Sequence, residues 1–259
     1  MFGYAYAIHN GATAIFETDD DNIPYEYAES ELEGVLRLGN NIIHERLNAE
    51  VGWLNIYQKF SVPRCWPRGF PLELIKHPGV EGLPGNDSKP WKVMQFLADL
   101  DPDVDAIYRM LTDNIVHFAR DRKYLLDEGT FCPFNSQATL WLPEVFPLLF
   151  LPVGISDRVA DILRGYIALA CLWKMDSTLA YSSPVVFQKR NAHDLLKDFS
   201  QEMQLYLNAD NWARLLKNIA GERASDYYRS ALNLFCNANV LPPACADLYR
   251  RFLSVSGIE

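Results

Sequence analysis

A run of three acidic residues, Asp19, Asp20 and Asp21, is the part of the sequence best suited to chemistry. It follows a short apolar run at residues 14–16 that is compatible with a buried strand. Neighbouring carboxylates repel one another and lose hydration on burial, so such a run needs either water or a cation beside it. Carboxylate oxygens suit Mg²⁺ or Mn²⁺, and a cation at the carboxyl edge of a sheet can neutralise a diphosphate leaving group, as nucleotide-sugar transfer requires. The alternative is a solvated turn, because Asp and Asn favour turns.

A second candidate group is the segment W-P-R-G-F-P at residues 66–71. Its prolines stiffen the loop, and Gly69 lets another group approach the backbone closely. Arg68 has the planar fork of donors that can hold a phosphate through two hydrogen bonds. The alternative is that Arg68 only pairs with one of the 33 acidic residues of the chain.

A third group combines acidic and basic residues at helical spacing: Asp157, Arg158, Asp161 and Arg164. Asp157 lies one helical turn before Asp161, so both are expected on the same side of a helix. Either these residues take part in a site, or they form ion pairs within the helix, each of which contributes only about 0.2–0.5 kcal/mol.

Other polar residues have simpler interpretations. The acidic cluster at residues 99–105 misses the spacing of an EF-hand loop and is better explained as a strand end followed by a helix cap. His193, with its polar neighbours, is expected at the surface near a helix cap. The sequence contains no Walker loop, no G-x-S-x-G and no H-E-x-x-H, so P-loop and hydrolase chemistry have no support.

The composition restricts the partners that the protein can bind and the kinds of site and segment that it can contain. The net charge of −9 and the absence of long Lys/Arg runs exclude a general binder of nucleic-acid backbones, which normally carries a basic face. Five widely spaced cysteines without a C-x-x-C give no zinc ribbon or thioredoxin-type site, and leave one or two disulfides open. The sequence holds no 18-residue apolar run, and its first residues lack the features of a signal peptide.

Several elements are needed to position these groups. Apolar periodicity and flanking residues predict helices at residues 3–11, 101–111 and 156–175, the last with Ser156 as its N-cap. They predict strands at residues 13–18, 51–60, 92–98 and 178–187. Residues 25–38 are expected to be irregular or helical. Loops are expected at residues 61–71 and 77–91, and mostly loop and extended chain at residues 130–147.

From Asn191 onward the pattern is helical. One apolar stripe contains Leu195, Leu196, Phe199, Met203 and Leu207, and another contains Ala224, Tyr227, Tyr228, Ala231, Leu232 and Phe235. We expect both stripes to pack against a core. The change from mixed to helical pattern predicts a mixed α/β domain at residues 1–208 and a helical extension at residues 209–259.

Taken together, these stretches resemble the STELLO family, Golgi proteins with a glycosyltransferase-like domain. The matching text runs from G-Y-A-Y-A-I-H-N-G-A-T-A-I-F-E-T-D-D-D through W-P-R-G-F-P-L, D-P-D-V-D-A-I-Y-R and P-F-N-S-Q-A-T-L-W to D-R-V-A-D-I-L-R-G-Y-I-A and V-F-Q-K-R-N-A-H-D-L-L-K-D-F, over roughly residues 3–210. Several motifs in one order are more specific than any single motif. The family is similar, more distantly, to the reversibly glycosylated polypeptides, which include UDP-arabinopyranose mutases.

The resemblance implies a GT-A-like fold, the mixed α/β fold of nucleotide-diphospho-sugar transferases. Such a domain normally opens with a strand and a helix that hold the nucleotide base. The motifs begin after that point, so we expect a GT-A-like domain without its N-terminal strand–helix unit, followed by the helical extension. The histidine that commonly completes a GT-A metal site has no clear match, and His193 is the nearest candidate.

The resemblance also implies roles for single residues. Asp19 and Asp21 stand where the mutase-like proteins bind a metal, and Asp19 and Asp20 where they bind the nucleotide. The segment Arg68-Gly69-Phe70-Pro71 is similar to the one that carries a reversibly glycosylated arginine, so Arg68 and Gly69 are expected at the nucleotide-sugar. Asp161 resembles the later acidic residue and is expected to orient the acceptor or to act as a base. The expected contacts of the sugar hydroxyls are Asn135 and Gln137.

The leading hypothesis is therefore a glycosyltransferase that uses Mn²⁺ or Mg²⁺ to transfer sugar from a UDP-sugar to a glycan or protein acceptor. One alternative is a catalytically silent Golgi scaffold that assembles polysaccharide synthase complexes. Another is a UDP-sugar mutase that depends on Arg68. A Golgi membrane location follows from the family alone, because the chain itself shows no anchor or signal.

Overall fold

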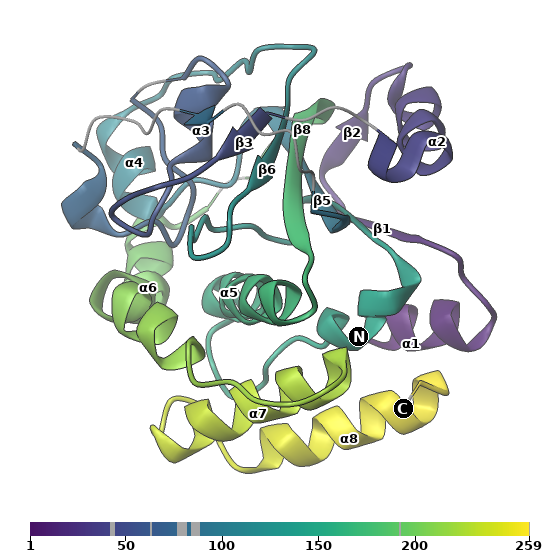
Figure 1. Ribbon diagram of the computed structural model, residues 1–259. Helices are drawn as coiled ribbons and strands as arrows, with labels where there is room; N and C mark the ends of the chain where they lie inside the picture. The colour runs from purple at the N-terminus through teal and green to yellow at the C-terminus, as the bar shows by residue number, and fades with distance from the viewer. Residues whose placement is uncertain (42–44, 63, 77–81, 84–88, 192, 259) are drawn as a thin grey trace.

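The computed structural model describes residues 1–41, 45–62, 64–76, 82–83, 89–191 and 193–258 (Figure 1). The helices are α1 (Phe2–His9), α2 (Ala28–Leu38), α3 (Ile56–Lys59), α4 (Ala106–Leu111), α5 (Asp157–Lys174), α6 (Leu195–Leu216), α7 (Ala224–Asn237) and α8 (Ala244–Ser256), with 3-10 turns η1 (Gly39–Asn41), η2 (Leu72–Leu74) and η3 (Pro143–Leu149). The strands are β1 (Ile15–Thr18), β2 (Asn22–Pro24), β3 (Glu45–Leu47), β4 (Gly82–Leu83), β5 (Trp91–Leu100), β6 (Lys123–Leu126), β7 (Ala138–Trp141) and β8 (Thr178–Gln188).

The strands form one mixed sheet in the order β1-β7-β5-β8-β6-β3-β4, and β2 pairs with β8 beside this path. Strands β5 and β8 are parallel. Strand β7 runs antiparallel to both β5 and β1, so β1 runs in the same direction as β5 and β8. The carboxyl ends of β1, β5 and β8 therefore meet at one edge of the sheet, which is where open α/β sheets bind ligands.

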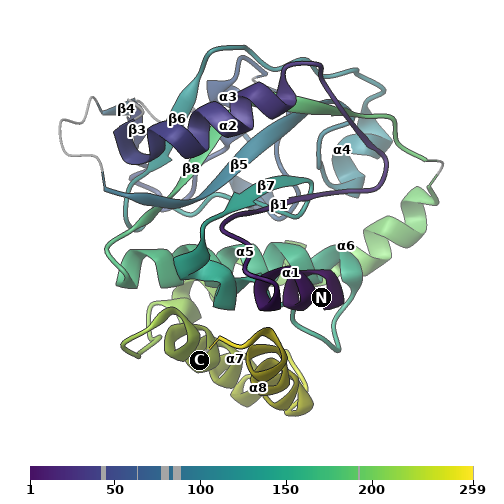
Figure 2. The ribbon, with the colours of Figure 1, turned by 90° about the vertical axis from the view of Figure 1, so that its right-hand side faces the viewer.

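Helices cover both faces of this sheet. Figure 2 shows α2 on one side, α5 with α1 and α6 on the other, and α7 with α8 in an outer layer beyond α5. The two faces have separate hydrophobic cores. The smaller one joins Ala28 and Val35 of α2 to Trp91 and Phe96 of β5, and the larger one surrounds α5, whose side chains from Val159 to Leu172 are almost all buried. The predicted mixed α/β class with C-terminal helices is confirmed.

The strongest predicted elements are present with small shifts. Helices α1 and α5 match the helices expected at residues 3–11 and 156–175, and strands β1, β5 and β8 match three of the predicted strands. Helix α4 begins at Ala106 because the Asp105 side chain caps it by accepting a hydrogen bond from the Tyr108 N–H. Most of the loop expected at residues 77–91 lies outside the described residues.

The prediction of a strand at residues 51–60 is wrong. The segment contains a turn at Gly52 and the short helix α3, which begins because the Asn55 side chain accepts a hydrogen bond from the Tyr57 N–H. Trp53, Leu54 and Phe60 are nevertheless buried. The apolar run therefore marks burial correctly, while a single capping side chain decides the backbone conformation.

The prediction that the first C-terminal stripe packs against a core is also wrong. Leu196 and Leu207 of α6 are 73% and 68% exposed, and Met203 is 37% exposed. The buried side of this helix carries Leu205, Ala209 and Trp212, together with acidic Asp198 and Glu202. Both carboxylates contact Arg158 of α5, so this side of the helix is buried with its charges paired. The second stripe, on α7, is confirmed as a core face, since Tyr228, Ala231, Leu232 and Phe235 are fully buried.

Helix α6 continues without a break through residue 208, where the sequence predicts a domain boundary. The larger hydrophobic core includes Leu205 before this position and Trp212 after it. The division into residues 1–208 and 209–259 stays a prediction. All five cysteines are free thiols, and none of the helices within the described ranges is long and apolar enough to cross a bilayer.

The orientation of α6 can be tested by comparing two leucines one half-turn apart. Leu205→Ala should lower the free energy of unfolding by about 2–4 kcal/mol, because it opens a cavity in the core. Leu207→Ala should change it by less than about 0.5 kcal/mol, because that side chain is exposed. Urea denaturation of both variants measures the difference, and equal losses would mean that the helix face is assigned wrongly.

Candidate functional site

Polar residues from distant parts of the chain gather at the shared carboxyl edge of β1, β5 and β8. Asp19 follows β1 directly, Asp103 follows β5, and Gln188 ends β8. Asp161 joins them from the first turns of α5, whose N-terminus lies at this edge because α5 leads back into β8 through a short connection. The structure thus brings the acidic run of residues 19–21 close to the later acidic residues of the chain.

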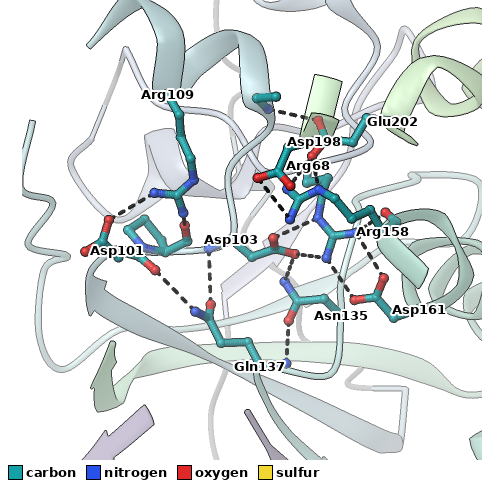
Figure 3. Close-up of polar contacts among 12 residues, drawn as sticks. Arg68, Asp101, Asp103, Arg109, Asn135, Gln137, Arg158, Asp161, Asp198 and Glu202 are labelled. Atoms are coloured by element: carbon teal, nitrogen blue, oxygen red, sulfur yellow. Dashed lines mark hydrogen bonds and ion pairs between the residues drawn. The ribbon is translucent and has the colours of Figure 1, made fainter. Parts of the chain in front are cut away.

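The centre of the site is an ion-pair group that we call the Arg68 cluster: Arg68, Asp103 and Asp161 (Figure 3). The guanidinium donates to both Asp103 oxygens from Nε and Nη2, at 2.8 Å each. It donates to both Asp161 oxygens from Nη1 and Nη2, at 3.0 Å each, and Nη1 also donates to the Arg158 carbonyl. All five N–H donors of Arg68 are thus engaged by protein groups.

Charge balance makes this buried group stable. Burial alone would lower the pKa of Arg68, but the charges of Asp103 and Asp161 outweigh it and hold that pKa well above its ordinary value. Burial alone would raise the pKa of Asp103, but the Arg68 charge outweighs it and lowers that pKa. A phosphate could take donors of Arg68 only if one of these carboxylate contacts opened, so the predicted role of Arg68 at the nucleotide-sugar stays a prediction.

Gly69 permits a close approach, as predicted, but the approaching group is α5. Its φ of +88° lies in the left-handed region, and a Cβ there would stand 2.5 Å from Ile162 Cγ2 and 2.6 Å from the Tyr166 hydroxyl. The Tyr166 hydroxyl donates to the Gly69 carbonyl. Gly69 thus lets the loop at residues 66–71 lie against α5, which places Arg68 beside Asp161.

Asp19 faces the Arg68 cluster from the end of β1. Its pKa is raised to about 7, first by burial, then by the charges of Asp103 and Asp161, and only partly offset by Arg68. Asp21 is close enough to raise this pKa further. The site therefore holds more carboxylates than one arginine can balance, which favours either a proton or a cation at Asp19. Asp20 points to solvent.

Two glutamines connect Asp21 to the Arg68 cluster. Gln188 Nε2 donates to Asp21 Oδ1 at 2.7 Å, and Gln188 Oε1 accepts from Gln137 Nε2 at 2.8 Å. Gln137 Oε1 then accepts from the Asp103 N–H at 3.1 Å. We call these side chains the amide chain. They fix the relative positions of Asp21 and Asp103.

Asn135 supports the same arrangement. Its Nδ2 donates to Asp103 Oδ2 at 2.7 Å, and its Oδ1 accepts from Gln95 Nε2 and from the Gln137 N–H. Asn135 and Gln137 are buried and bonded to protein groups. In this structure they position Asp103, and their expected contacts with sugar hydroxyls stay a prediction.

The charged residues of α5 do not pair with one another. Asp161 binds Arg68, Arg164 binds Glu17 of β1 at 2.6 Å, and Arg158 binds Glu202 of α6. Each charge therefore ties α5 to a different element. The alternative of ion pairs within the helix is wrong for these three residues.

Sequence reasoning missed Asp103, Glu17 and Glu202 as members of this charge network. Asp103 was included only in a strand-end and cap cluster, which is correct for Asp105. The signal for Asp103 was its place just after a buried strand, the same signal that singled out Asp19. His193 is at the surface, as expected, with Nδ1 3.3 Å from Asp198 Oδ2. Within the described ranges no group of three His, Cys, Asp or Glu side chains is arranged to hold a metal ion.

Two plant proteins are similar to this chain in sequence. No protein-family model matches the chain. Probable glycosyltransferase STELLO2 of Arabidopsis thaliana is 30% identical over 246 residues, which cover 87% of this chain and 30% of that protein. Probable glycosyltransferase STELLO1 of the same plant is 29% identical over 253 residues, which cover 90% of this chain and 31% of that protein. The chain is a distant homologue of the STELLO proteins.

This homology confirms the resemblance found in the motifs. The chain spans less than a third of the length of these STELLO relatives, 30% and 31%. The matched part takes in nearly the whole of this chain.

The close approach at Gly69 gives a first test of the site. Gly69→Ala should lower the free energy of unfolding by about 2–4 kcal/mol, because Ile162 and Tyr166 are fully buried and cannot move aside. Gly129→Ala is the matched control, since Gly129 has a φ of +85° with nothing within 4 Å of the added Cβ. It should cost only about 1 kcal/mol. Equal losses in urea denaturation would contradict the packing role.

The crowding of carboxylates at Asp19 predicts a pH effect on stability. Because the folded pKa is about 7, above the ordinary value of 3.8, the folded chain binds more protons than the unfolded chain between these values. The contribution of Asp19 to the free energy of unfolding therefore falls as pH rises from about 4 to about 7. Relative to the parent chain, Asp19→Asn should gain on the order of 2 kcal/mol at pH 8 over pH 4. Urea denaturation at both pH values in the presence of a chelator measures this, and a pH-independent difference would contradict it.

Proposed function

We propose that the protein is a GT-A-like glycosyltransferase domain that transfers sugar from a UDP-sugar with the help of Mn²⁺ or Mg²⁺. The observation that carries this proposal is the unbalanced carboxylate at Asp19, at the ligand-binding edge of the sheet. The homology to proteins described as probable glycosyltransferases supports the same chemistry.

The residues present fit a divalent cation of this kind. Mg²⁺ and Mn²⁺ commonly bind through one or two carboxylates and complete their coordination with substrate phosphates and water. Asp19 and Asp21 supply these carboxylates, and the amide chain fixes Asp21 through one oxygen only, Oδ1. When bound, the cation would neutralise charge on the diphosphate leaving group. Asp20, exposed in the same turn, would face the nucleotide.

The Arg68 cluster supplies the other half of the proposed site. Asp161 would orient the acceptor hydroxyl or accept its proton, and Arg68 holds both Asp161 oxygens in place for that role. Opening of the contact between Arg68 and Asp161 would make guanidinium donors available to the sugar or phosphate. The mutase alternative requires Arg68 itself to react, and its five engaged donors give that alternative no support.

The proposed partners are a UDP-sugar and a glycan or protein acceptor. A Golgi membrane location belongs to the same proposal, through the STELLO homology, whereas association with polysaccharide synthase complexes belongs to the scaffold alternative. The scaffold alternative would need the surface of the domain but not Asp19 or Asp21. Binding measurements on variants of the acidic run therefore separate the two functions.

Calorimetric titration of UDP-glucose into the purified chain, with and without Mn²⁺, tests the proposal. Binding should require Mn²⁺, and Asp21→Asn should weaken it by at least about tenfold, because a ligand bond and a charge are lost together. The variant should remain folded, since Asp21 is partly exposed.

Asp247→Asn is the matched control, because Asp247 is an exposed carboxylate of α8, 62% exposed, away from the acidic run. It should leave the affinity unchanged. Equal affinity of the Asp21→Asn variant and the parent chain would remove the metal role. Capture of a synthase by a folded Asp19→Ala/Asp21→Ala double variant, together with no UDP-glucose binding by the parent chain, would favour the scaffold.

A further inference from the structure

A groove of about 410 Å³ lies beside the candidate site, at the carboxyl ends of β5 and β8. One wall comes from the end of β5 and from α4 with the residues after it, including Asp101, Arg109 and Thr112. The other wall comes from the segment after β8, including Arg190 and His193. Its size is within the range of small-molecule sites. The function proposed above assigns no role to these basic residues.

Arg190 lines this groove and has few recorded hydrogen bonds. Its side chain is only 12% exposed, yet the structure records one hydrogen bond from it, Nη2 to Asp198 Oδ2 at 3.1 Å. Its Nε is buried and has no hydrogen-bond partner among the described residues. Arg109 resembles it: Nη1 and Nη2 bind Asp101 and the Pro102 carbonyl, while the buried Nε is without a partner in the part of the chain that the structure describes. Both Nε atoms are closed to solvent, so a molecule in the groove would meet Arg190 at Nη1, for which the structure records no hydrogen bond among the described residues.

Three basic side chains approach one carboxylate, Asp198. Asp198 lies 3.1 Å from Arg190, 3.3 Å from His193 and 3.7 Å from Arg158. Arg158 also forms an ion pair with Glu202. Burial, together with the charges of Arg109 and Arg158, lowers the pKa of Arg190 to about 10, and Asp103 and Asp198 offset this only partly. Of the acidic residues lining the groove, Asp101 is paired with Arg109, and Asp113 lies at the exposed rim.

Arg190 differs from Arg68 in how many of its donors are hydrogen-bonded. Sequence reasoning chose Arg68 as the arginine that holds a phosphate, but Arg68 has no donor left to give. Arg190 follows β8 at the same edge of the sheet and keeps most of its donors, next to a groove.

We propose that this groove binds an oxyanion group of a substrate, either phosphate or carboxylate, and that Arg190 and Arg109 hold it. Arg190 would donate from Nη1 to an oxygen of the group, as a charge-assisted hydrogen bond. The inference rests on the proposed function for the source of this group, which is either the phosphates of the donor nucleotide or the carboxylate of an acidic sugar on the acceptor. The groove itself can be tested without either substrate.

The experiment is calorimetric titration of the purified chain with inorganic pyrophosphate and, separately, with glucuronate, in buffer that contains a chelator and no divalent cation. At least one of the two anions should bind. Arg190→Gln and Arg109→Gln should each weaken that binding by at least about tenfold, because a charge-assisted hydrogen bond is lost. Arg214→Gln is the matched control: Arg214 is 64% exposed on α6 and pairs with Asp210, and its loss should leave the affinity unchanged.

Each outcome decides the inference. Tight pyrophosphate binding that depends on Arg190 would assign the groove to phosphate, and the same dependence for glucuronate alone would assign it to an acidic sugar. No binding of either anion, or equal affinities of Arg190→Gln and the parent chain, would overturn the proposal. If melting curves show that Arg190→Gln is unfolded, Arg190→Lys replaces it and should also bind at least about tenfold more weakly, since a lysine keeps the charge but lacks the planar guanidinium.

Anion binding tests the groove separately from the proposed transferase. Pyrophosphate binding is measured without metal or nucleotide, so it does not depend on Asp19 or Asp21. Loss of Mn²⁺-dependent UDP-glucose binding with retained, Arg190-dependent anion binding would reject the transferase and keep the groove. The opposite pair of results would keep the transferase and reject the groove.

Discussion

The buried contact of Arg68 with Asp103 and Asp161 is the interaction on which the site depends. It joins the proline-rich loop and the segment after β5, which also share an antiparallel bridge between Pro67 and Val104, to the N-terminal part of α5. Buried charges are tolerated only with well-oriented partners, and removal of one partner leaves the others uncompensated. The loop can reach this position because Gly69 has no side chain to strike α5. The geometry of the acidic residues around Asp19 is therefore a consequence of how one guanidinium is satisfied.

Charge is distributed unevenly around this centre. Carboxylates crowd together around Asp19, whereas Arg109 and Arg190 each pair with one carboxylate, Asp101 and Asp198. Figure 3 shows Asp103 between Arg68 on one side and the Asp101–Arg109 pair on the other. The crowded carboxylates and the groove thus lie at the same edge of the sheet, on either side of Asp103.

The sequence predicted those features that depend on local pattern. Long periodic segments such as α5 and β8 were found, and Asp19 was chosen correctly as a residue at the end of a strand. Residues 51–60 and the stripe on α6 failed for a shared reason: a polar side chain, Asn55 in one and Glu202 in the other, outweighed the apolar pattern by finding a specific partner. The Arg68 cluster could not be predicted, because its three residues lie 35 to 93 positions apart in the sequence and are joined only by the folded topology.

The amide chain between Asp103 and Asp21 has a fixed direction. Each of its hydrogen bonds has the donor on the side of Asp103 and the acceptor on the side of Asp21, from backbone N–H through both glutamines to a carboxylate oxygen. A flip of either amide would set two donors against each other at one end and two oxygens at the other. The two glutamines can therefore change orientation only together with the groups at both ends of the chain. Rotation of the Asp21 carboxylate is thereby linked mechanically to the segment that carries Asp103, more than 80 residues away in the sequence.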